Sequence, residues 1–203
     1  GASAVDEYTS LSAKDAYEAE YWPLELYKQS LAPPEKELSR RVVLVTGAAS
    51  GIGKAIAKSF ADEGANIAIL DTNIETAEQV ADGIRQSGRS ACAVQCDVGM
   101  SRDVSTAVDQ VVSELGGVDI MVCNAGIIRQ SNIVDMAEDE WDLIIRNNLK
   151  SVFLCSQAGA QQMIRQGNGG RIIAISSIHA VLSEPSCGHY TAAKGGIEAF
   201  CRT

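Results

Sequence analysis

From residue 41 onward, short apolar runs alternate with stretches of helical periodicity. The runs are rich in Val, Ile and Ala and cover residues 42–45, 65–70, 91–95, 120–123 and 171–175. Helices are predicted between them over residues 54–63, 74–86, 104–115 and 141–166. Continuously apolar strands that alternate with helices of about ten or more residues are typical of a parallel sheet covered on both faces. The pattern therefore predicts an α/β fold with a doubly wound parallel sheet.

The first forty residues have a different character. They place four tyrosines and a tryptophan among acidic residues, and they include the turn-forming pair Pro33-Pro34. Ser12 is positioned to cap a helix that continues to Trp22. We predict a helical lead-in or linker over residues 1–40, which packs its aromatic side chains on another surface. A nucleotide-binding domain is then predicted over residues 41–203.

Composition and charge exclude several classes of protein. The net charge is −9 and the pI about 4.7, so the surface repels nucleic acid and anionic lipid. No apolar run is long enough to span a bilayer, and no basic leader precedes an apolar segment. The six cysteines show neither Cys-x-x-Cys nor zinc-finger spacing. They are expected to be small buried side chains of a cytoplasmic protein, and no metal site is predicted.

The first apolar run leads directly into a glycine-rich turn and then into a predicted helix. Gly47 permits the tight turn, Gly51 lets the backbone approach a pyrophosphate, and Gly53 lets the helix pack close to the strand. The helix start offers N–H groups and the positive end of its dipole to phosphates. These features predict a Rossmann-like dinucleotide site in which Ser50 and Ile52 also contact the cofactor.

An acidic residue at the end of the second strand predicts which dinucleotide binds. Asp71 lies 18 residues past Gly53 and is followed by Thr72 and Asn73 rather than by an arginine. A carboxylate here accepts hydrogen bonds from the adenosine ribose and repels a 2′-phosphate. NAD is therefore the expected cofactor, in preference to NADP.

A tyrosine and a lysine share one face of the last predicted helix. Tyr190 and Lys194 are four residues apart, and Ser177 stands thirteen residues before Tyr190. A phenol with a pKa of about 10 is a poor base at neutral pH. A Lys194 ammonium about 5 Å away favours the phenolate by about 3 kcal/mol at an effective dielectric of about 20. This corresponds to a pKa lowered by roughly two units, which makes Tyr190 a candidate general base.

Together these residues resemble the short-chain dehydrogenase/reductase family. The resemblance covers residues 41–203 and rests on the glycine turn, the sequence Cys123-Asn124-Ala125-Gly126, Asn148, Ser177 and Tyr190-x-x-x-Lys194. It implies a catalytic set of Ser177, Tyr190 and Lys194, with Asn148 holding a water in a proton relay. Lys194 is also implied to bind the nicotinamide ribose. Further cofactor contacts are implied for Asn124, Ala125 and Gly126 beside the central strand, and for Asp97 and Val98 at the adenine.

The family resemblance also carries expectations about the whole protein. It implies a small alcohol or aldehyde as substrate and a homo-oligomer, a dimer or tetramer, built through the long helices. The chain does not begin with Met, and it ends at Thr203, close to the Tyr190 helix. We therefore expect it to be a piece of a longer protein whose dehydrogenase domain continues. Residues 1–203 alone are expected to bind cofactor poorly and to turn over little substrate.

The lead-in carries a second resemblance. Residues 20–28 and 32–35 are similar to the junction in bacterial fusions of rhamnulose-phosphate aldolase with a short-chain dehydrogenase. This resemblance implies that an aldolase precedes the chain and that the dehydrogenase part processes lactaldehyde in carbohydrate metabolism.

The segment between Ser177 and Tyr190 is expected to line the substrate pocket. His179, Glu184 and Cys187 are tentative substrate contacts, and His189 is a further candidate. Cys187 as a nucleophile is an alternative, but no oxyanion or base motif surrounds it. Other enzyme alternatives are a polyol or sugar dehydrogenase and a 3-oxoacyl reductase. A nucleotide-sensing or scaffolding module is the alternative from a different class, although such a module needs no general base.

Overall fold

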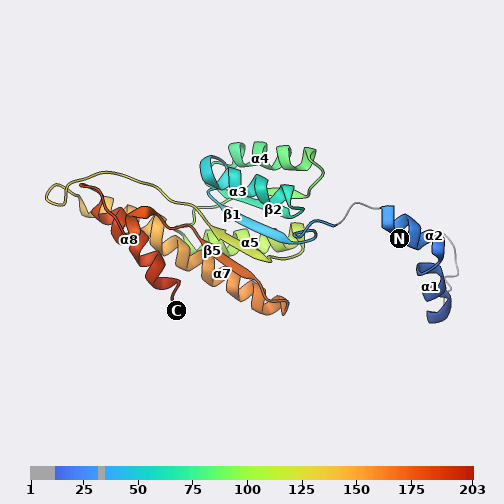
Figure 1. Cartoon of the computed structure of the whole chain (residues 1–203). Coiled ribbons are helices and arrows are strands. Elements are labelled where there is room, and N and C mark those ends of the chain that lie inside the picture. Colours follow the sequence, from blue (N-terminus) through green and yellow to red (C-terminus); the bar gives the residue numbers. More distant parts are fainter. Residues whose placement is uncertain (1–11, 32–34) are drawn as a thin grey trace. The chain divides into compact units, whose positions relative to one another are not determined.

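The computed structural model describes residues 12–31 and 35–203 (Figure 1). The chain divides into two compact units, with the boundary between Glu35 and Lys36. The boundary lies a few residues before the start of the first strand. Leu38 belongs to the second unit because its N–H donates to the carbonyl of Glu63 at 3.1 Å and its side chain packs against the core there.

In the lead-in unit, residues 12–31 form two short helices, α1 (Ala13–Glu20) and α2 (Pro23–Leu31). The predicted cap is confirmed, because Ser12 Oγ accepts a hydrogen bond from the Asp15 N–H at 3.1 Å. The helix ends before Trp22, since a residue that precedes proline disfavours helical geometry and proline is favoured in a first turn. Trp22 is 58% exposed and Tyr27 is 61% exposed within this structure. Their packing on another surface stays a prediction, and Tyr8 and the Pro33-Pro34 turn lie outside the described residues.

The second unit is built on a five-stranded parallel sheet, as predicted (Figure 1). Its strand order is β3-β2-β1-β4-β5. The strands are β1 (Val42–Thr46), β2 (Asn66–Asp71), β3 (Ala91–Gln95), β4 (Ile120–Cys123) and β5 (Arg171–Ala174). The chain moves outward from β1 in one direction and then returns to place β4 on its other side. This reversal opens a crevice at the carboxyl ends of β1 and β4, where ligands bind in such sheets.

Two layers of helices cover the sheet. One layer is α3 (Gly51–Asp62) with α4 (Ile74–Gln86), and the other is α5 (Ser101–Leu115) with α7 (Ser151–Gln166). Side chains alternate along β1, so Val43 and Val45 pack toward α3 and α4 whereas Val42 and Leu44 pack toward α5 and α7. Figure 1 shows the two layers on opposite sides of the strands. Burial on both faces explains why the strands are continuously apolar.

The long helix predicted over residues 141–166 is wrong in detail. The structure has α6 (Glu138–Ile145), then a π-helical turn η1 (Arg146–Lys150), and only then α7. Three side chains interfere with regular α-helical bonding. Asn147 Nδ2 donates to the Leu143 carbonyl, Asn148 Nδ2 to the Ile144 carbonyl, and Ser151 Oγ to the Asn147 carbonyl. These carbonyls lie four residues earlier, where backbone N–H groups bond in an α-helix, and such competition widens the turn.

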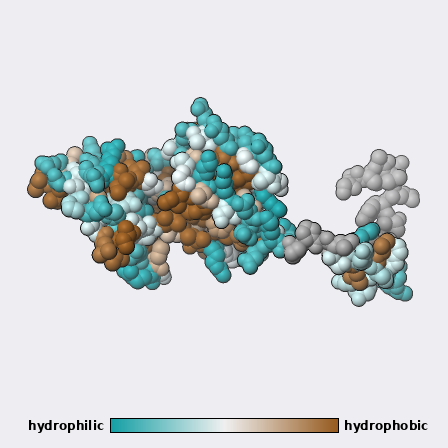
Figure 2. Space-filling model, turned by 45° about the horizontal axis from the view of Figure 1, so that its top comes forward, coloured by the Kyte–Doolittle hydropathy of each residue, from teal (hydrophilic) through white to brown (hydrophobic). Residues whose placement is uncertain are grey.

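Edge strand β5 is less buried than the sequence suggests. Ile172 and Ile173 are 39% and 40% exposed, whereas the apolar residues of β1 are almost fully buried. Figure 2 shows other apolar side chains at the surface of this unit, and the exposed set includes Ile133, Val134, Ile164, Val181 and Leu182. Among the residues that the structure describes, no helix combines the length and the apolar character needed to cross a bilayer.

Gly53 has no room for a side chain, which gives a stability prediction. A Cβ at this position would lie 2.3 Å from the Gly47 carbonyl oxygen and 2.5 Å from Asn124 Nδ2. Because backbone would have to move, Gly53→Ala is expected to lower the free energy of unfolding by about 1–3 kcal/mol in urea titrations. Gly83 is the matched control, since it is helical and exposed with nothing within 4 Å. Gly83→Ala should raise stability by about 0.5–1 kcal/mol, and equal effects of the two variants would contradict the packing argument.

Candidate active site

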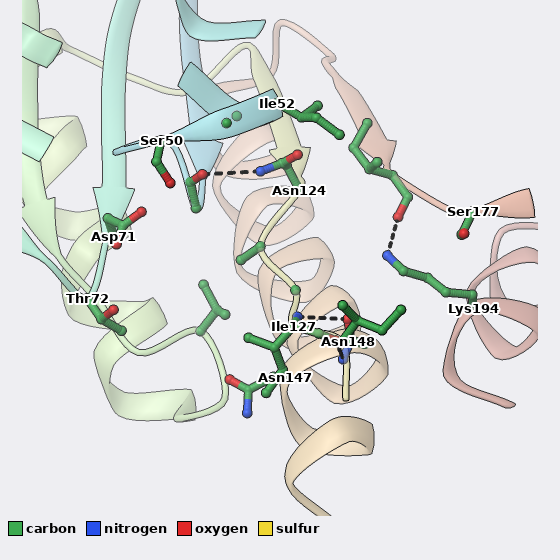
Figure 3. A pocket seen from close by; sticks show the side chains of 18 of the residues that line it. Ser50, Ile52, Asp71, Thr72, Asn124, Ile127, Asn147, Asn148, Ser177 and Lys194 are labelled. Atoms are coloured by element: carbon green, nitrogen blue, oxygen red, sulfur yellow. Dashed lines mark hydrogen bonds between the residues drawn. The ribbon is translucent and has the colours of Figure 1, made fainter. Parts of the chain in front are cut away.

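A cleft of about 660 Å³ lies at the carboxyl ends of the strands (Figure 3). Its lining includes every residue predicted to bind cofactor and all four residues predicted to be catalytic. The sequence did not single out seven other lining residues: Thr72, Cys96, Ile127, Ile128, Asn147, Ile175 and Ser176. Four of these directly follow the strand ends and could have been found from that position alone, namely Thr72, Cys96, Ile175 and Ser176.

The glycine turn forms one wall of the cleft. Gly47 has φ +63°, and a Cβ there would lie 2.9 Å from Ala125 Cα. Gly51 has φ +53°, and a Cβ at this position would have no atom within 4 Å, so its backbone borders open space. Ser50 precedes α3, but within the described part of the chain its side chain does not cap the helix. The first N–H groups of α3 are therefore free of a side-chain cap and suited to phosphate oxygens.

Asn124 and Thr46 hold the two central strand ends together. Thr46 Oγ1 donates to the Val122 carbonyl and accepts from the N–H groups of Asn124 and Ala125 at 3.0 and 3.1 Å. Asn124 Nδ2 donates to the Thr46 carbonyl at 2.9 Å. Thr46 is buried, so these bonds are shielded from water. They fix the floor of the cleft between the glycine turn and the segment that follows β4.

Two carboxylates lie at the end of the cleft away from Lys194. Asp71 accepts hydrogen bonds from the N–H groups of Ala49 at 3.0 Å and Asn73 at 3.1 Å. Its half-buried carboxylate keeps lone pairs available for a ribose. Asp97 accepts from the Gly99 N–H at 2.8 Å, and one of its oxygens lies 3.9 Å from Arg146 Nη2. Figure 3 shows Asp71 on one side of the pocket and Lys194 with Ser177 on the other.

Lys194 is buried beside Tyr190 on α8 (Gly188–Phe200). Its Nζ donates to the Ile175 carbonyl at 2.8 Å and lies 5.7 Å from the centre of the Tyr190 ring. The side chain is only 4% exposed, and this burial lowers the pKa of Lys194 below its usual value because the ammonium loses water. One hydrogen bond leaves two ammonium donors for ligands in the cleft.

Ser177 reaches Tyr190 through a histidine. Ser177 caps the short 3₁₀ helix η2 (Ile178–Ala180), since its Oγ accepts from the His179 N–H at 3.2 Å. Ser177 Oγ also lies 3.3 Å from His179 Nδ1. The His179 ring meets the Tyr190 ring edge-on, with centroids 5.4 Å apart. Ser177, Tyr190 and Lys194 therefore border the same end of the cleft, with His179 between the first two.

Asn148, on the π-helical turn, bonds to backbone groups through both its amide nitrogen and its oxygen. Its Nδ2 donates to the carbonyls of Ile127 and Ile144, and its Oδ1 accepts from the Ile127 N–H at 3.1 Å. Both amide hydrogens are thus used, while Oδ1 retains one lone pair. A Cβ built on Gly126 would stand 2.5 Å from Asn148 Oδ1 and 3.8 Å from Lys194 Nζ. The missing Cβ of Gly126 therefore leaves open space between these two polar atoms.

None of the three tentative substrate residues belongs to the cleft lining. His179, Glu184 and Cys187 form a cluster of their own, and only His179 contacts a catalytic side chain. Cys187 is fully buried, and His189 is fully buried with its Nε2 3.7 Å from Glu140 Oε1. All six cysteines belong to the described residues and are free, and only Cys201 is exposed. Burial raises the pKa of the Cys92 and Cys96 thiols to about 12, which disfavours their reactive thiolates.

The doubly wound sheet and the glycine turn define a Rossmann-type fold, with its cleft at the place where such folds bind dinucleotides. Comparison with known proteins gives the family. The sequence profile described as short chain dehydrogenase matches residues 41–203, and the chain belongs to that family.

Several individual proteins are also similar. The uncharacterized oxidoreductase YuxG of Bacillus subtilis is 39% identical over 96% of this chain, which spans 28% of that protein. The 3-oxoacyl-[acyl-carrier-protein] reductase FabG of Staphylococcus aureus is 41% identical over 76% of this chain and 63% of its own length. A crystal structure of a short-chain type dehydrogenase/reductase from Mycobacterium marinum superimposes with a TM-score of 0.78 at 37% identity, covering 80% of this chain and 65% of that one. The chain thus spans less than two thirds of each of these proteins.

Proposed function

We propose that this chain is the cofactor-binding and catalytic part of an NAD-dependent oxidoreductase that acts on a small alcohol or aldehyde. The observation that carries the proposal is the gathering of Ser177, Tyr190 and Lys194 at one end of a cleft whose other end holds Asp71. Nicotinamide, when bound, supplies the hydride acceptor or donor. The cleft suits such a cofactor because its glycine turn leaves open space at the start of α3.

The chain's own residues handle the proton and the developing charge. In oxidation, Tyr190 takes the proton from the substrate hydroxyl as the carbon-bound hydrogen leaves with its electron pair. The Ser177 hydroxyl donates to the substrate oxygen and holds it beside Tyr190. The Lys194 ammonium stabilises the phenolate and binds the nicotinamide ribose. A water between Asn148 Oδ1 and Lys194 Nζ passes the proton on, in the space that Gly126 leaves open.

Asp71 supports NAD in preference to NADP. Its carboxylate ends β2 and is held by two backbone N–H groups, so it cannot easily swing away from a ribose placed there. Proposed cofactor contacts are the glycine turn with Ser50 and Ile52, then Asp97 and Val98, and finally Asn124, Ala125 and Gly126, all of which line the cleft. His179 is the proposed substrate contact, because it touches both Ser177 and the Tyr190 ring.

Lactaldehyde is the proposed substrate, in a fusion with an upstream aldolase. The support for a longer protein is a match to YuxG that covers 96% of the chain, includes most of residues 1–40 and accounts for only 28% of that protein. The hydrate of an aldehyde offers the same hydroxyl and carbon-bound hydrogen as an alcohol, so oxidation to the acid needs no further residue. A cytoplasmic homo-oligomer is proposed as well, supported by the family and by the six free cysteines.

A 3-oxoacyl reductase is the second candidate. It is favoured by the 41% identity to FabG and by the exposed apolar side chains of Val181 and Leu182 in the loop after Ser177, which suit an acyl chain. A polyol or sugar dehydrogenase would use the same catalytic residues.

Substrate assays on the full-length protein distinguish these functions. Purified protein is given lactaldehyde with NAD⁺, a panel of polyols with NAD⁺, and a 3-oxoacyl thioester with NADH or NADPH, and nicotinamide absorbance is followed. We expect the highest kcat/KM with lactaldehyde and NAD⁺. A higher value with the thioester would favour the reductase, and cofactor binding without turnover of any substrate would favour a sensing module.

A further inference from the structure

Three side chains outside the cleft lining form a compact cluster, with His179 on η2 and with Glu184 and Cys187 in the segment between η2 and α8. A His179 ring nitrogen, a Glu184 carboxylate oxygen and Cys187 Sγ all lie within 4.8 Å of one another. His179 Nε2 and Glu184 Oε2 are 3.9 Å apart, which is too long for a hydrogen bond. The three donor types are nitrogen, oxygen and sulfur, the set that proteins use for Zn²⁺ rather than for Mg²⁺ or Ca²⁺.

The two ring nitrogens of His179 have the environment expected of a metal ligand. Its Nε2 is buried from water and has no hydrogen-bond partner among the described residues. Its other ring nitrogen, Nδ1, lies 3.3 Å from Ser177 Oγ. A histidine that binds a metal through one nitrogen characteristically donates the other N–H to a neighbouring oxygen. His179 has this arrangement, with Ser177 as the acceptor and a lone pair on Nε2 directed at the cluster.

The loop backbone holds Cys187 in place, whereas Glu184 is exposed. Ser186 adopts φ +66°, and its carbonyl accepts from the Ser131 N–H at 2.8 Å while its Oγ donates to Asn132 Oδ1 at 2.6 Å. Cys187 follows immediately and is fully buried. The Glu184 side chain is 66% exposed, so its carboxylate is free to move the short distance that coordination requires. Tetrahedral Zn²⁺ places its ligand atoms about 3.6 Å apart, so ligand atoms that already lie within 4.8 Å of one another need to move by only about 1 Å.

We propose that His179 Nε2, the Glu184 carboxylate and Cys187 Sγ bind one divalent zinc-type ion, with its fourth position open to water. The ion joins the segment that carries Ser177 to the start of the helix that carries Tyr190. It also fixes His179 with its proton on Nδ1, which makes Ser177 Oγ an acceptor there and leaves the Ser177 O–H to donate elsewhere. His179 is also the proposed substrate contact, but binding of the ion can be tested without substrate or cofactor.

Cobalt(II) is the probe for the site, since it binds in place of Zn²⁺ and its bond to a thiolate has a charge-transfer absorption. Full-length protein is freed of metal with a chelator and titrated with Co²⁺. We expect the thiolate band to saturate at one equivalent and to disappear when Zn²⁺ is added. Cys187→Ser should abolish the band, and His179→Gln should weaken binding by at least about 10- to 100-fold, the cost of losing a residue that only orients a ligand.

Cys201→Ser is the matched control, because Cys201 is the one exposed cysteine and lies outside the cluster. It should keep the band and the affinity of the unsubstituted protein. Circular dichroism checks that each variant is folded. If Cys187→Ser does not fold, the affinity of His179→Gln for Co²⁺ tests the proposal. The proposal is overturned if no thiolate band forms, if the band survives Cys187→Ser, if His179→Gln leaves the affinity unchanged, or if Cys201→Ser removes the band.

Discussion

Replacing Tyr190 by phenylalanine is expected to lower kcat/KM of the full-length protein by about 10²- to 10⁴-fold, the usual contribution of a positioned general base. The substitution removes one oxygen and leaves the ring that packs edge-on against His179. Lys194 keeps its bond to the Ile175 carbonyl, so its position does not depend on the phenol. The dissociation constant for NAD⁺ should therefore change little. Steady-state kinetics and a cofactor-binding titration on the same preparation measure the two effects separately.

Tyr27→Phe is the matched control for this experiment. It removes the same hydroxyl from an exposed tyrosine of the lead-in unit, so its kinetics should equal those of the unsubstituted protein. Full turnover by Tyr190→Phe would show that Tyr190 is not the general base. A nucleotide-sensing module would then again be a candidate function for the chain. A parallel loss of NAD⁺ binding would instead assign Tyr190 to holding the cofactor.

The sequence predicts the parts of the site that depend on local backbone. The glycine turn could be recognised because a tight turn and a close helix approach restrict Gly47 and Gly53 to residues without a Cβ. Asp71 could be placed because a residue at the carboxyl end of a parallel strand must lie at one edge of the sheet. Tyr190 and Lys194 could be paired because helical periodicity puts residues four apart on one face.

Other features depend on tertiary contacts that no periodicity shows. The π-helical turn arises from the side chains of Asn147, Asn148 and Ser151 bonding to carbonyls of their own helix, whereas the residues around them read as one continuous helix. The cluster of His179, Glu184 and Cys187 has no recognised ligand spacing. It forms because Ser186 takes a left-handed conformation and is bonded to the loop that follows β4. The absence of a metal motif in the sequence was therefore not informative about this loop.

The nucleotide preference gives the second large effect. Asp71→Asn is expected to shift the ratio of kcat/KM for NAD⁺ to that for NADP⁺ by on the order of 10²-fold toward NADP⁺. Two unit charges about 4 Å apart repel by about 4 kcal/mol at an effective dielectric of about 20, and each 1.4 kcal/mol is a factor of about ten. This repulsion alone would give about a 10³-fold change, and we expect about 10²-fold because solvent screens the half-buried Asp71 carboxylate. Asparagine keeps one carbonyl oxygen, which can still accept from the Ala49 N–H at the glycine turn, whereas the bond from the Asn73 N–H is lost.

Asp97→Asn separates this charge effect from general damage to the cleft. Asp97 is a carboxylate of the same cleft, at the end of the next strand, and one of its oxygens is already bonded to the Gly99 N–H. If it meets the adenine, as proposed, it lies away from the 2′ position and its neutralisation should alter both nucleotides by a similar factor. A preference that follows Asp97 rather than Asp71, or that follows neither, would place the adenosine ribose elsewhere. The proposed orientation of the cofactor would then be wrong, because Asp71 alone assigns its adenosine end and Lys194 its nicotinamide end.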